Sequence, residues 1–210
     1  MTTLALELGP PRSRATARVA YRAGCAVVGA ALISVLAQVS IPLPFTPVPI
    51  TGQTLGVLLV GAAYGPWLGA STVVLYLVWA LVGWPVLAPN ADGSHDAGTA
   101  VLGAAAFTGG YLWGFIVASG LVGWLSRRGW DRTFGSAIGA MVLGEVVLYA
   151  IGLPWLSRSL SIAGLPSTLE DALAAGLYPY IVGDVLKLLA AAALLPGAWW
   201  FLERVRPRED

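Results

Sequence analysis

The chain has 210 residues, of which 57% are hydrophobic and only 11% are charged, with a formal net charge of +1. A soluble domain carries about 25% charged residues, so this composition excludes a soluble globular enzyme and a disordered chain. One cysteine and one histidine also exclude a disulfide framework and a metal site built from clusters of these residues, and the sequence indicates a polytopic membrane protein.

The first half of the chain predicts three apolar helices separated by prolines. No charged residue occurs from Ala23 to Ala91, a stretch long enough for three spans of about 20 residues each. Prolines break helices, and they divide this stretch near Pro42, Pro66 and Pro85. The predicted helices cover about residues 22–39, 50–64 and 67–83.

The second half predicts three further membrane helices and two long loops. One loop covers about residues 85–106 and the other about residues 157–176. The second loop is expected to contain a short surface helix, with Ser167 as its N-cap and Glu170 as the acidic partner of a capping box. The predicted membrane helices cover about residues 107–125, 134–156 and 177–202.

The arginines predict the orientation of these six spans. Three groups of arginines lie before the first helix, between the fourth and fifth helices and after the sixth, and with six spans all three groups share one face of the membrane. The positive-inside rule makes that face cytoplasmic. Both termini are therefore expected in the cytoplasm, with tails at residues 1–21 and 203–210 around a membrane domain at residues 22–202. The arginines concerned are Arg12, Arg14, Arg18, Arg22, Arg127, Arg128, Arg132, Arg204, Arg206 and Arg208.

Three ionisable residues lie within the predicted spans, where buried charge is costly and usually functional. They are Glu145 in the fifth helix, and Asp184 and Lys187 in the sixth. Asp184 and Lys187 are three residues apart, so they share one face of the helix. They either neutralise each other as a structural ion pair or line a ligand cavity that opens to the outer side.

Three further residues are predicted at the same outer depth as this pair. Gln53 begins the second helix, Tyr111 begins the fourth, and Tyr149 lies one turn beyond Glu145 on the fifth. Taken singly, a tyrosine near the membrane interface more often belongs to the aromatic belt than to a binding site. Their common depth makes them candidates for the same cavity.

Small residues recur at every fourth position of the first helix. Ala26, Ala30 and Ser34 form a smooth strip of the kind that lets two membrane helices pack closely. The strip either packs within this chain or docks another membrane protein.

Five segments of the chain resemble the sequence blocks of the BioY family, which are the biotin-binding substrate-specificity (S) components of energy-coupling factor (ECF) transporters. The resemblance covers about residues 20–195, and its most specific parts are the proline-rich block and the Gly-Asp-x-x-Lys block. In chain order the segments are residues 38–54 (QVSIPLPFTPVPITGQT), 83–87 (GWPVL), 108–115 (TGGYLWGF), 151–156 (IGLPWL) and 178–187 (YPYIVGDVLK).

The resemblance implies an all-α bundle of six transmembrane helices in the cell membrane, with an outward-facing biotin pocket. The implied partners, besides membrane lipid, are a transmembrane coupling protein, on which Ala26 and Ala30 would dock, and a pair of cytosolic ATPases. No enzymatic activity, cofactor or metal is expected. The implied binding positions are Gln53, Asn90, Asp184 and Lys187.

The chemistry of biotin suits these residue types. Asp184 can accept hydrogen bonds from the N–H groups of the urea-like ring, and the amide of Gln53 or Asn90 can both donate and accept. Lys187 either meets the carboxylate of biotin or keeps Asp184 ionised. The aromatic residues expected as apolar walls are Tyr111, Tyr149 and Trp84.

A self-sufficient, proton-coupled transporter of biotin or a related small vitamin is the alternative, with Glu145 or Asp184 as proton carrier. It predicts inverted internal repeats, which the sequence does not show. The sequence contains no phosphate-binding loop of the P-loop type, so the first interpretation requires ATPases supplied by partners.

Overall fold

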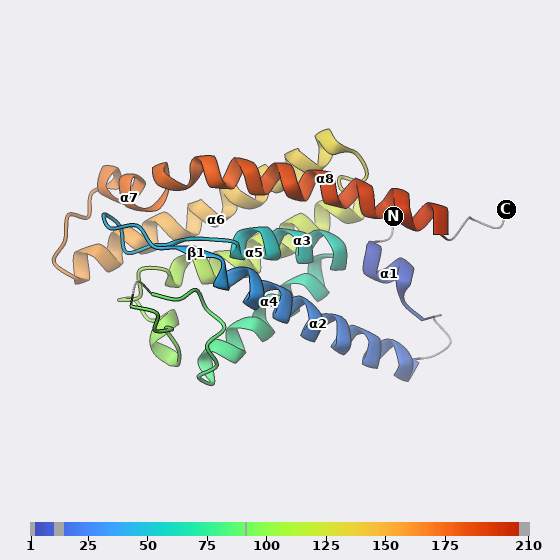
Figure 1. Ribbon diagram of the computed structural model, residues 1–210, viewed down its shortest axis with the longest axis horizontal. Helices are drawn as coiled ribbons and strands as arrows, with labels where there is room; N and C mark the ends of the chain where they lie inside the picture. The colour runs from blue at the N-terminus through green and yellow to red at the C-terminus, as the bar shows by residue number, and fades with distance from the viewer. Residues whose placement is uncertain (1–2, 11–14, 91, 206–210) are drawn as a thin grey trace.

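The chain folds into a bundle whose long helices run mostly along the long axis of the molecule (Figure 1). The computed structural model describes residues 3–10, 15–90 and 92–205. Between α2 and α3, two-residue strands form an antiparallel hairpin, β1 (Ser40–Ile41) with β2 (Ile50–Thr51). The helices are α1 (Leu4–Leu8), α2 (Ala15–Gln38), α3 (Gln53–Tyr64), α4 (Pro66–Leu81), α5 (Gly109–Arg127), α6 (Phe134–Ile162), α7 (Leu169–Gly176) and α8 (Ile181–Val205), with 3-10 turns at Thr99–Leu102 and Tyr178–Tyr180.

Four helical stretches of the described chain are long and apolar enough to cross a membrane. They are α2, α5, α6 and the stretch Leu169–Val205, which contains α8. The apolar helices α3 and α4 are shorter, with 12 and 16 residues. At 1.5 Å per residue α3 is about 18 Å long, less than the roughly 30 Å of a hydrocarbon core. The fold is therefore that of an all-α membrane protein with four full-length candidate spans.

The largest differences from the predicted helix ends are in α2 and α6. α2 begins at Ala15 rather than near residue 22, since long arginine side chains can reach the interface from within a helix. α6 continues to Ile162 rather than ending near residue 156. Its extra turns are held because Ser157 Oγ donates to Ser167 O at 2.7 Å and Ser159 Oγ donates to Ala104 O at 2.8 Å. Four arginines of the predicted cytoplasmic groups lie outside the described residues: Arg12, Arg14, Arg206 and Arg208.

The short surface helix of the second long loop is present as α7, but its cap differs from the predicted one. Thr168, not Ser167, is the N-cap, and Asp171, not Glu170, completes the capping box. Thr168 Oγ1 donates to Asp171 Oδ2 at 2.6 Å, and Asp171 N donates to Thr168 Oγ1 at 3.2 Å. The predicted pair, Ser167 with Glu170, and the observed pair, Thr168 with Asp171, both have the spacing of a capping box. The helix begins one residue later than predicted, so the second pair forms the box.

Ala30 is fully buried, which favours the alternative that the small-residue strip packs within this chain. It lies with Ile33 on the side of α2 that packs into the hydrophobic core. A Cβ built on neighbouring Gly29 would lie 2.7 Å from Thr72 Cγ2, so glycine permits the close approach of α2 to α4. Ala26, one turn earlier, is half-buried. The small residues of this face therefore serve packing within the chain.

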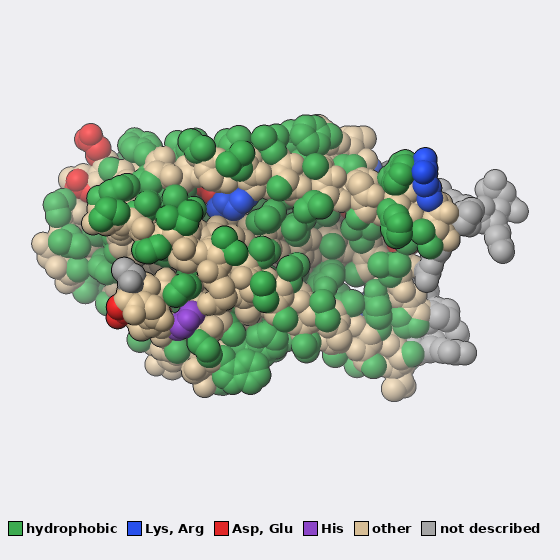
Figure 2. Space-filling view, in the orientation of Figure 1, with side chains coloured by type: hydrophobic (Ala, Val, Ile, Leu, Met, Phe, Trp, Pro, Cys, Tyr) green, Lys and Arg blue, Asp and Glu red, His purple; other side chains and the backbone are tan. Residues whose placement is uncertain are grey.

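At one end of the bundle, α8 is tied to the link between α5 and α6. Trp199 Nε1 donates to Asp131 Oδ2 at 2.7 Å, and the Arg132 guanidinium lies 3.3 Å from the centroid of the Trp199 ring. Burial raises the pKa of Asp131. α1 and the end of α8 lie at this end, whereas α7 and the hairpin lie at the other (Figure 1). In Figure 2 hydrophobic side chains are spread along the whole length of the face, and most of the charged side chains in view lie toward its two ends.

Candidate functional site

A cavity of about 550 Å³ lies at the end of the bundle that carries the hairpin and α7. Its walls come from the hairpin, the start of α3, the loop after α4, α5, α6 and α8. Of the residues predicted for the site, Gln53, Asn90, Tyr111, Tyr149, Asp184 and Lys187 all line it. The apolar part of its wall includes Val48, Leu87, Val101, Phe107, Leu112, Phe115 and Leu148.

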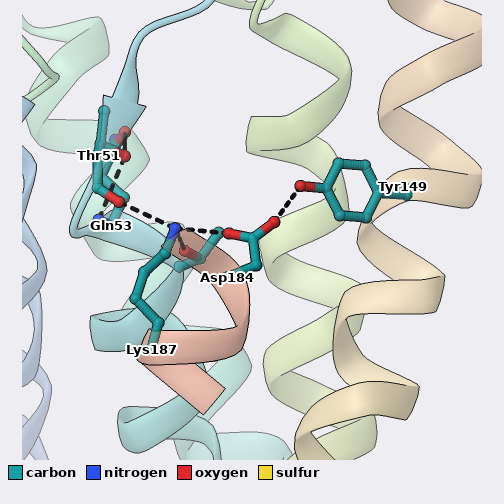
Figure 3. A network of polar contacts seen from close by, with 6 residues as sticks. Thr51, Gln53, Tyr149, Asp184 and Lys187 are labelled. Atoms are coloured by element: carbon teal, nitrogen blue, oxygen red, sulfur yellow. Dashed lines mark hydrogen bonds and ion pairs between the residues drawn. The ribbon is translucent and has the colours of Figure 1, made fainter. Parts of the chain in front are cut away.

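Asp184 and Lys187 form an ion pair in the cavity wall. The two interpretations of the pair, as a structural ion pair and as part of a ligand cavity, are therefore compatible. Lys187 Nζ lies 2.7 Å from Asp184 Oδ1 and also donates to Thr54 Oγ1 at 2.7 Å and to Thr51 O at 3.1 Å. An ammonium group has three donors, and here all three are used. Figure 3 shows Lys187 reaching from α8 to the start of α3, with Asp184 between Lys187 and Tyr149. The lysine thus fixes the carboxylate and joins α8 to α3.

Two tyrosines complete the side of the cavity formed by α5 and α6. The hydroxyl of Tyr149 donates to Asp184 Oδ2, and the Tyr149 ring meets the Tyr111 ring edge-on, with centroids 6.1 Å apart. Tyr111 donates its own hydroxyl to Gly176 O at 3.0 Å. A Cβ on Gly176 would lie 2.3 Å from that hydroxyl, so glycine at the end of α7 lets Tyr111 reach the α7 backbone.

The start of α3 is shaped to present Gln53 to the cavity. A Cβ on Gly52 would lie 2.6 Å from Leu36 O, so glycine allows α3 to begin directly against α2. Gln53 is 7% exposed, donates to Tyr76 Oη at 2.6 Å, and accepts from Thr51 Oγ1 at 3.0 Å. The amide is therefore held in one orientation, and each of its polar atoms retains capacity for one further hydrogen bond.

Asn90 lies in the loop after α4 and is exposed at the rim of the cavity. Its Nδ2 donates to Ser94 Oγ and to Asp96 Oδ1, both at 3.1 Å. The loop is braced further because Ser94 donates to Asp92 Oδ1, and this hydrogen bond holds the pKa of Asp92 below its usual value. Both Asn90 amide hydrogens are in use, so its carbonyl oxygen is the atom offered to a ligand.

Three residues singled out by the sequence lie outside the cavity wall. Trp84 is 53% exposed and packs on Trp79 with ring centroids 5.3 Å apart, so it is not the expected apolar wall. His95 folds back onto its own loop, with Nδ1 2.9 Å from Leu87 O. Glu145 is buried at 6% exposure, and neither carboxylate oxygen has a hydrogen-bond partner in the described chain.

Sequence reasoning missed two tyrosines that position the site. Tyr76, fully buried in α4, anchors Gln53 and donates to Val86 O at 3.2 Å. Tyr180 lines the cavity and donates to Val48 O, which ties the start of α8 to the proline-rich segment. Tyr180 could have been predicted as a site residue, because it lies in the segment Tyr178-Pro179-Tyr180. Tyr76 could not, because it is a single tyrosine in an apolar helix.

The arrangement suits a small ligand with polar groups at one side and apolar surface elsewhere. The carboxylate of Asp184 is a strong acceptor, Gln53 is a fixed donor and acceptor, and Tyr111, Phe107 and Phe115 supply apolar contact. Among the described residues, no group of three or more His, Cys, Asp or Glu side chains is placed to hold a metal ion.

Fold and site together define a multi-pass, all-α membrane protein with a polar ligand cavity near one end. Its fold is similar to the crystal structure, at 2.1 Å, of the S component for biotin from an ECF-type ABC transporter, with a TM-score of 0.71, 24% identity, and coverage of 90% of this chain and 93% of that one. At this identity the match shows the shared fold.

The sequence profile of the BioY family matches residues 12–204. The chain is 37% identical over 161 residues to the biotin transporter BioY of Rhizobium etli, covering 73% of this chain and 79% of that protein. It is 38% identical over 168 residues to the biotin transporter BioY of Rhodobacter capsulatus, covering 76% and 83%. This chain therefore belongs to the BioY family.

Proposed function

We propose that this chain is the biotin-binding S component of an ECF-type ABC transporter and that it takes up biotin across the cell membrane. Membership of the BioY family and the shared fold support a transporter component and not an enzyme. The observation that carries the proposal is the network of Asp184, Lys187, Tyr149 and Gln53 in the wall of a cavity of about 550 Å³.

The network matches the urea-like ring of biotin, and the open side of the cavity suits its carboxylate. Asp184 has lone pairs left on both oxygens after accepting from Lys187 and Tyr149, so it accepts an N–H of the urea-like ring. Gln53 Nε2 keeps one hydrogen for the urea oxygen. The carboxylate of biotin lies toward the rim and solvent, because all three hydrogens of the Lys187 ammonium are already donated.

The proposed topology has six spans with both termini in the cytoplasm. α3 and α4 serve as short spans, and α3 is supplemented by the extended proline-rich segment before it. Exposed tryptophans at the end opposite the cavity fit a membrane interface. Arginines stack on two of them, Arg128 on Trp124 at 3.6 Å and Arg204 on Trp200 at 3.8 Å. The cavity then opens to the outside.

The proposed partners are a transmembrane coupling protein and a pair of cytosolic ATPases. Since Ala30 is buried, the coupling protein docks on the exposed side of α2, where small residues such as Gly24 and Ala31 leave a low surface. A Cβ on Gly24 would meet no atom within 4 Å, so that position faces away from the bundle.

Equilibrium binding of labelled biotin to the purified chain in detergent, with no partner and no nucleotide, tests the proposal. We expect saturable binding that unlabelled biotin competes away and that an analogue without the urea ring leaves intact. Absence of binding, in protein shown to be folded, would overturn the proposal.

Glu145 favours a second candidate, a proton-coupled transporter that works without ATPases. Its carboxylate is buried in α6, one turn from Tyr149, with neither oxygen paired among the described residues. Biotin uptake into vesicles that contain this chain alone discriminates the two. Uptake driven by a pH gradient and abolished by Glu145→Gln supports proton coupling, whereas no uptake without coupling protein and ATPases supports the ECF assignment.

A further inference from the structure

A second cavity, of about 330 Å³, lies between α1, the first turns of α2, the start of α4 and the end of α5. These elements meet at the end of the bundle opposite the hairpin and α7 (Figure 1). The first cavity therefore does not extend to it, and none of the biotin-site residues lines it. Its wall includes the arginines Arg18, Arg22 and Arg127 and the apolar residues Leu6, Pro10 and Leu68.

The three arginine side chains have no ion-pair partner among the residues that the structure describes. The ion pairs found there involve other basic groups, Arg132 and Lys187. Moreover, the Nε atoms of Arg18 and Arg127 are buried and have no hydrogen-bond partner. A buried donor left unpaired costs free energy, and a charged one costs more. Three positive charges around one cavity, two of them with a buried and unpaired Nε, indicate an anionic ligand.

The position of Arg127 is fixed by the corner between α3 and α4. Gly65 forms that corner with a φ of 82°, and a Cβ there would lie 3.3 Å from Arg127 Nε. The guanidinium thus packs directly against the backbone of the corner. A donor group held in place before binding loses little freedom when the ligand arrives.

The surroundings place this cavity at the level of lipid headgroups. Trp67 directly precedes Leu68 of the cavity wall and is 79% exposed, and Trp124, one turn before Arg127, is 43% exposed. Exposed tryptophans of membrane proteins concentrate at the interface. Basic pockets between membrane helices on the cytoplasmic side bind anionic headgroups.

We propose that this cavity binds a negatively charged phosphate group, supplied by the headgroup of an anionic phospholipid or by a free phosphate compound. The planar, forked donors of arginine match phosphate oxygens in pairs. Leu6 and Leu68 add apolar surface beside the charges, which suits a ligand that carries acyl chains. The proposal does not depend on biotin binding, because the two cavities share no residue.

Native mass spectrometry of the chain in detergent, with added phosphatidylglycerol or phosphatidylcholine, tests the proposal and its lipid source. We expect phosphatidylglycerol to be retained in preference to phosphatidylcholine. In the double variant Arg18→Gln with Arg127→Gln, retention should fall about tenfold or more, since each lost contact is a hydrogen bond to a charged group. Arg128→Gln with Arg204→Gln is the matched control, with the same loss of charge at the same end, and it should retain the lipid.

A thermal-unfolding measurement with inorganic phosphate, in lipid-free detergent, tests whether a free phosphate compound supplies the phosphate group. Stabilisation by phosphate that the cavity variant loses and the control keeps assigns the site to a free phosphate compound. Arg22→Gln changes an exposed arginine of the cavity wall, and it replaces the double variant in both measurements if that variant does not fold. Equal retention of both lipids with no effect of phosphate, or equal losses in cavity and control variants, would overturn the proposal.

Discussion

Asp184 connects the two halves of the cavity wall. On one side it pairs with Lys187, whose ammonium also bonds Thr51 and Thr54 at the start of α3, and on the other it accepts from Tyr149 of α6. A buried charge is tolerated when it is paired and hydrogen-bonded, and this one is both. The same contacts hold the carboxylate in the wall of the cavity, so in the proposed function stability and binding depend on one network.

Tyr149→Phe tests the part of this network that lies on α6. Phenylalanine keeps the ring, and therefore the edge-on contact with Tyr111, but removes the hydroxyl that donates to Asp184. We expect biotin affinity to fall about tenfold or more, the scale of a hydrogen bond to a charged group. The measurement is the equilibrium dissociation constant. Tyr178→Phe, at an exposed tyrosine, is the control, and equal affinity of all three proteins would contradict the role of Tyr149.

At the scale of the elements, the two faces of α2 differ in exposure. Ala30 and Ile33 are buried in the core, whereas Val28, Ala31 and Val35 are exposed. The sequence identified the small residues but could not choose between the two faces, because alanine and glycine are spread along the whole helix.

Tryptophan at two adjacent positions of α2 separates packing within the chain from the proposed docking. Ala30→Trp places an indole in a filled core, and overpacking costs about 1–3 kcal/mol or more, so we expect a lower unfolding temperature and weaker biotin binding. Ala31→Trp lies on the exposed side and should leave both unchanged while preventing co-purification with the coupling protein. If Ala31→Trp still co-purifies with that protein, docking on this side of α2 is wrong.

Hydropathy and prolines were enough to locate the six apolar helices, because lipid imposes long uncharged segments. They were not enough for the hairpin, whose strands of two residues are too short to show alternation. In the site, the three-residue spacing of Asp184 and Lys187 placed both on one face. The anchoring of Gln53 by Tyr76 depends on how α3 meets α4, which no local pattern reports.

At the scale of the whole molecule, the two ends of the bundle differ in chemistry. The larger cavity lies at the end that carries the hairpin and α7, where Figure 2 also shows acidic side chains. At the opposite end arginines stack on exposed tryptophans. This polarity supports the proposed orientation, in which the loops face outward.

Cysteine labelling in intact cells tests that orientation. In a Cys25→Ser background, single cysteines replace Asp92 in the loop after α4 and Glu203 near the end of α8, both exposed positions. A membrane-impermeant maleimide should label the first from outside and the second only after the membrane is opened, because six spans put these positions on opposite sides. The reverse pattern, or labelling of both from outside, would refute the proposed topology.

The central claim is that the Asp184–Lys187 pair binds the ligand and does not serve structure alone. The most direct measurement is the equilibrium dissociation constant for biotin of the double variant Asp184→Asn with Lys187→Met. Since both charges are removed together, neither member of the pair is left as a buried charge without its partner, and the fold should persist. We expect the loss of about 2–5 kcal/mol typical of a buried charged contact, which raises the dissociation constant roughly 30-fold or more. Binding equal to that of the parent protein would show that the pair is structural and would contradict the account.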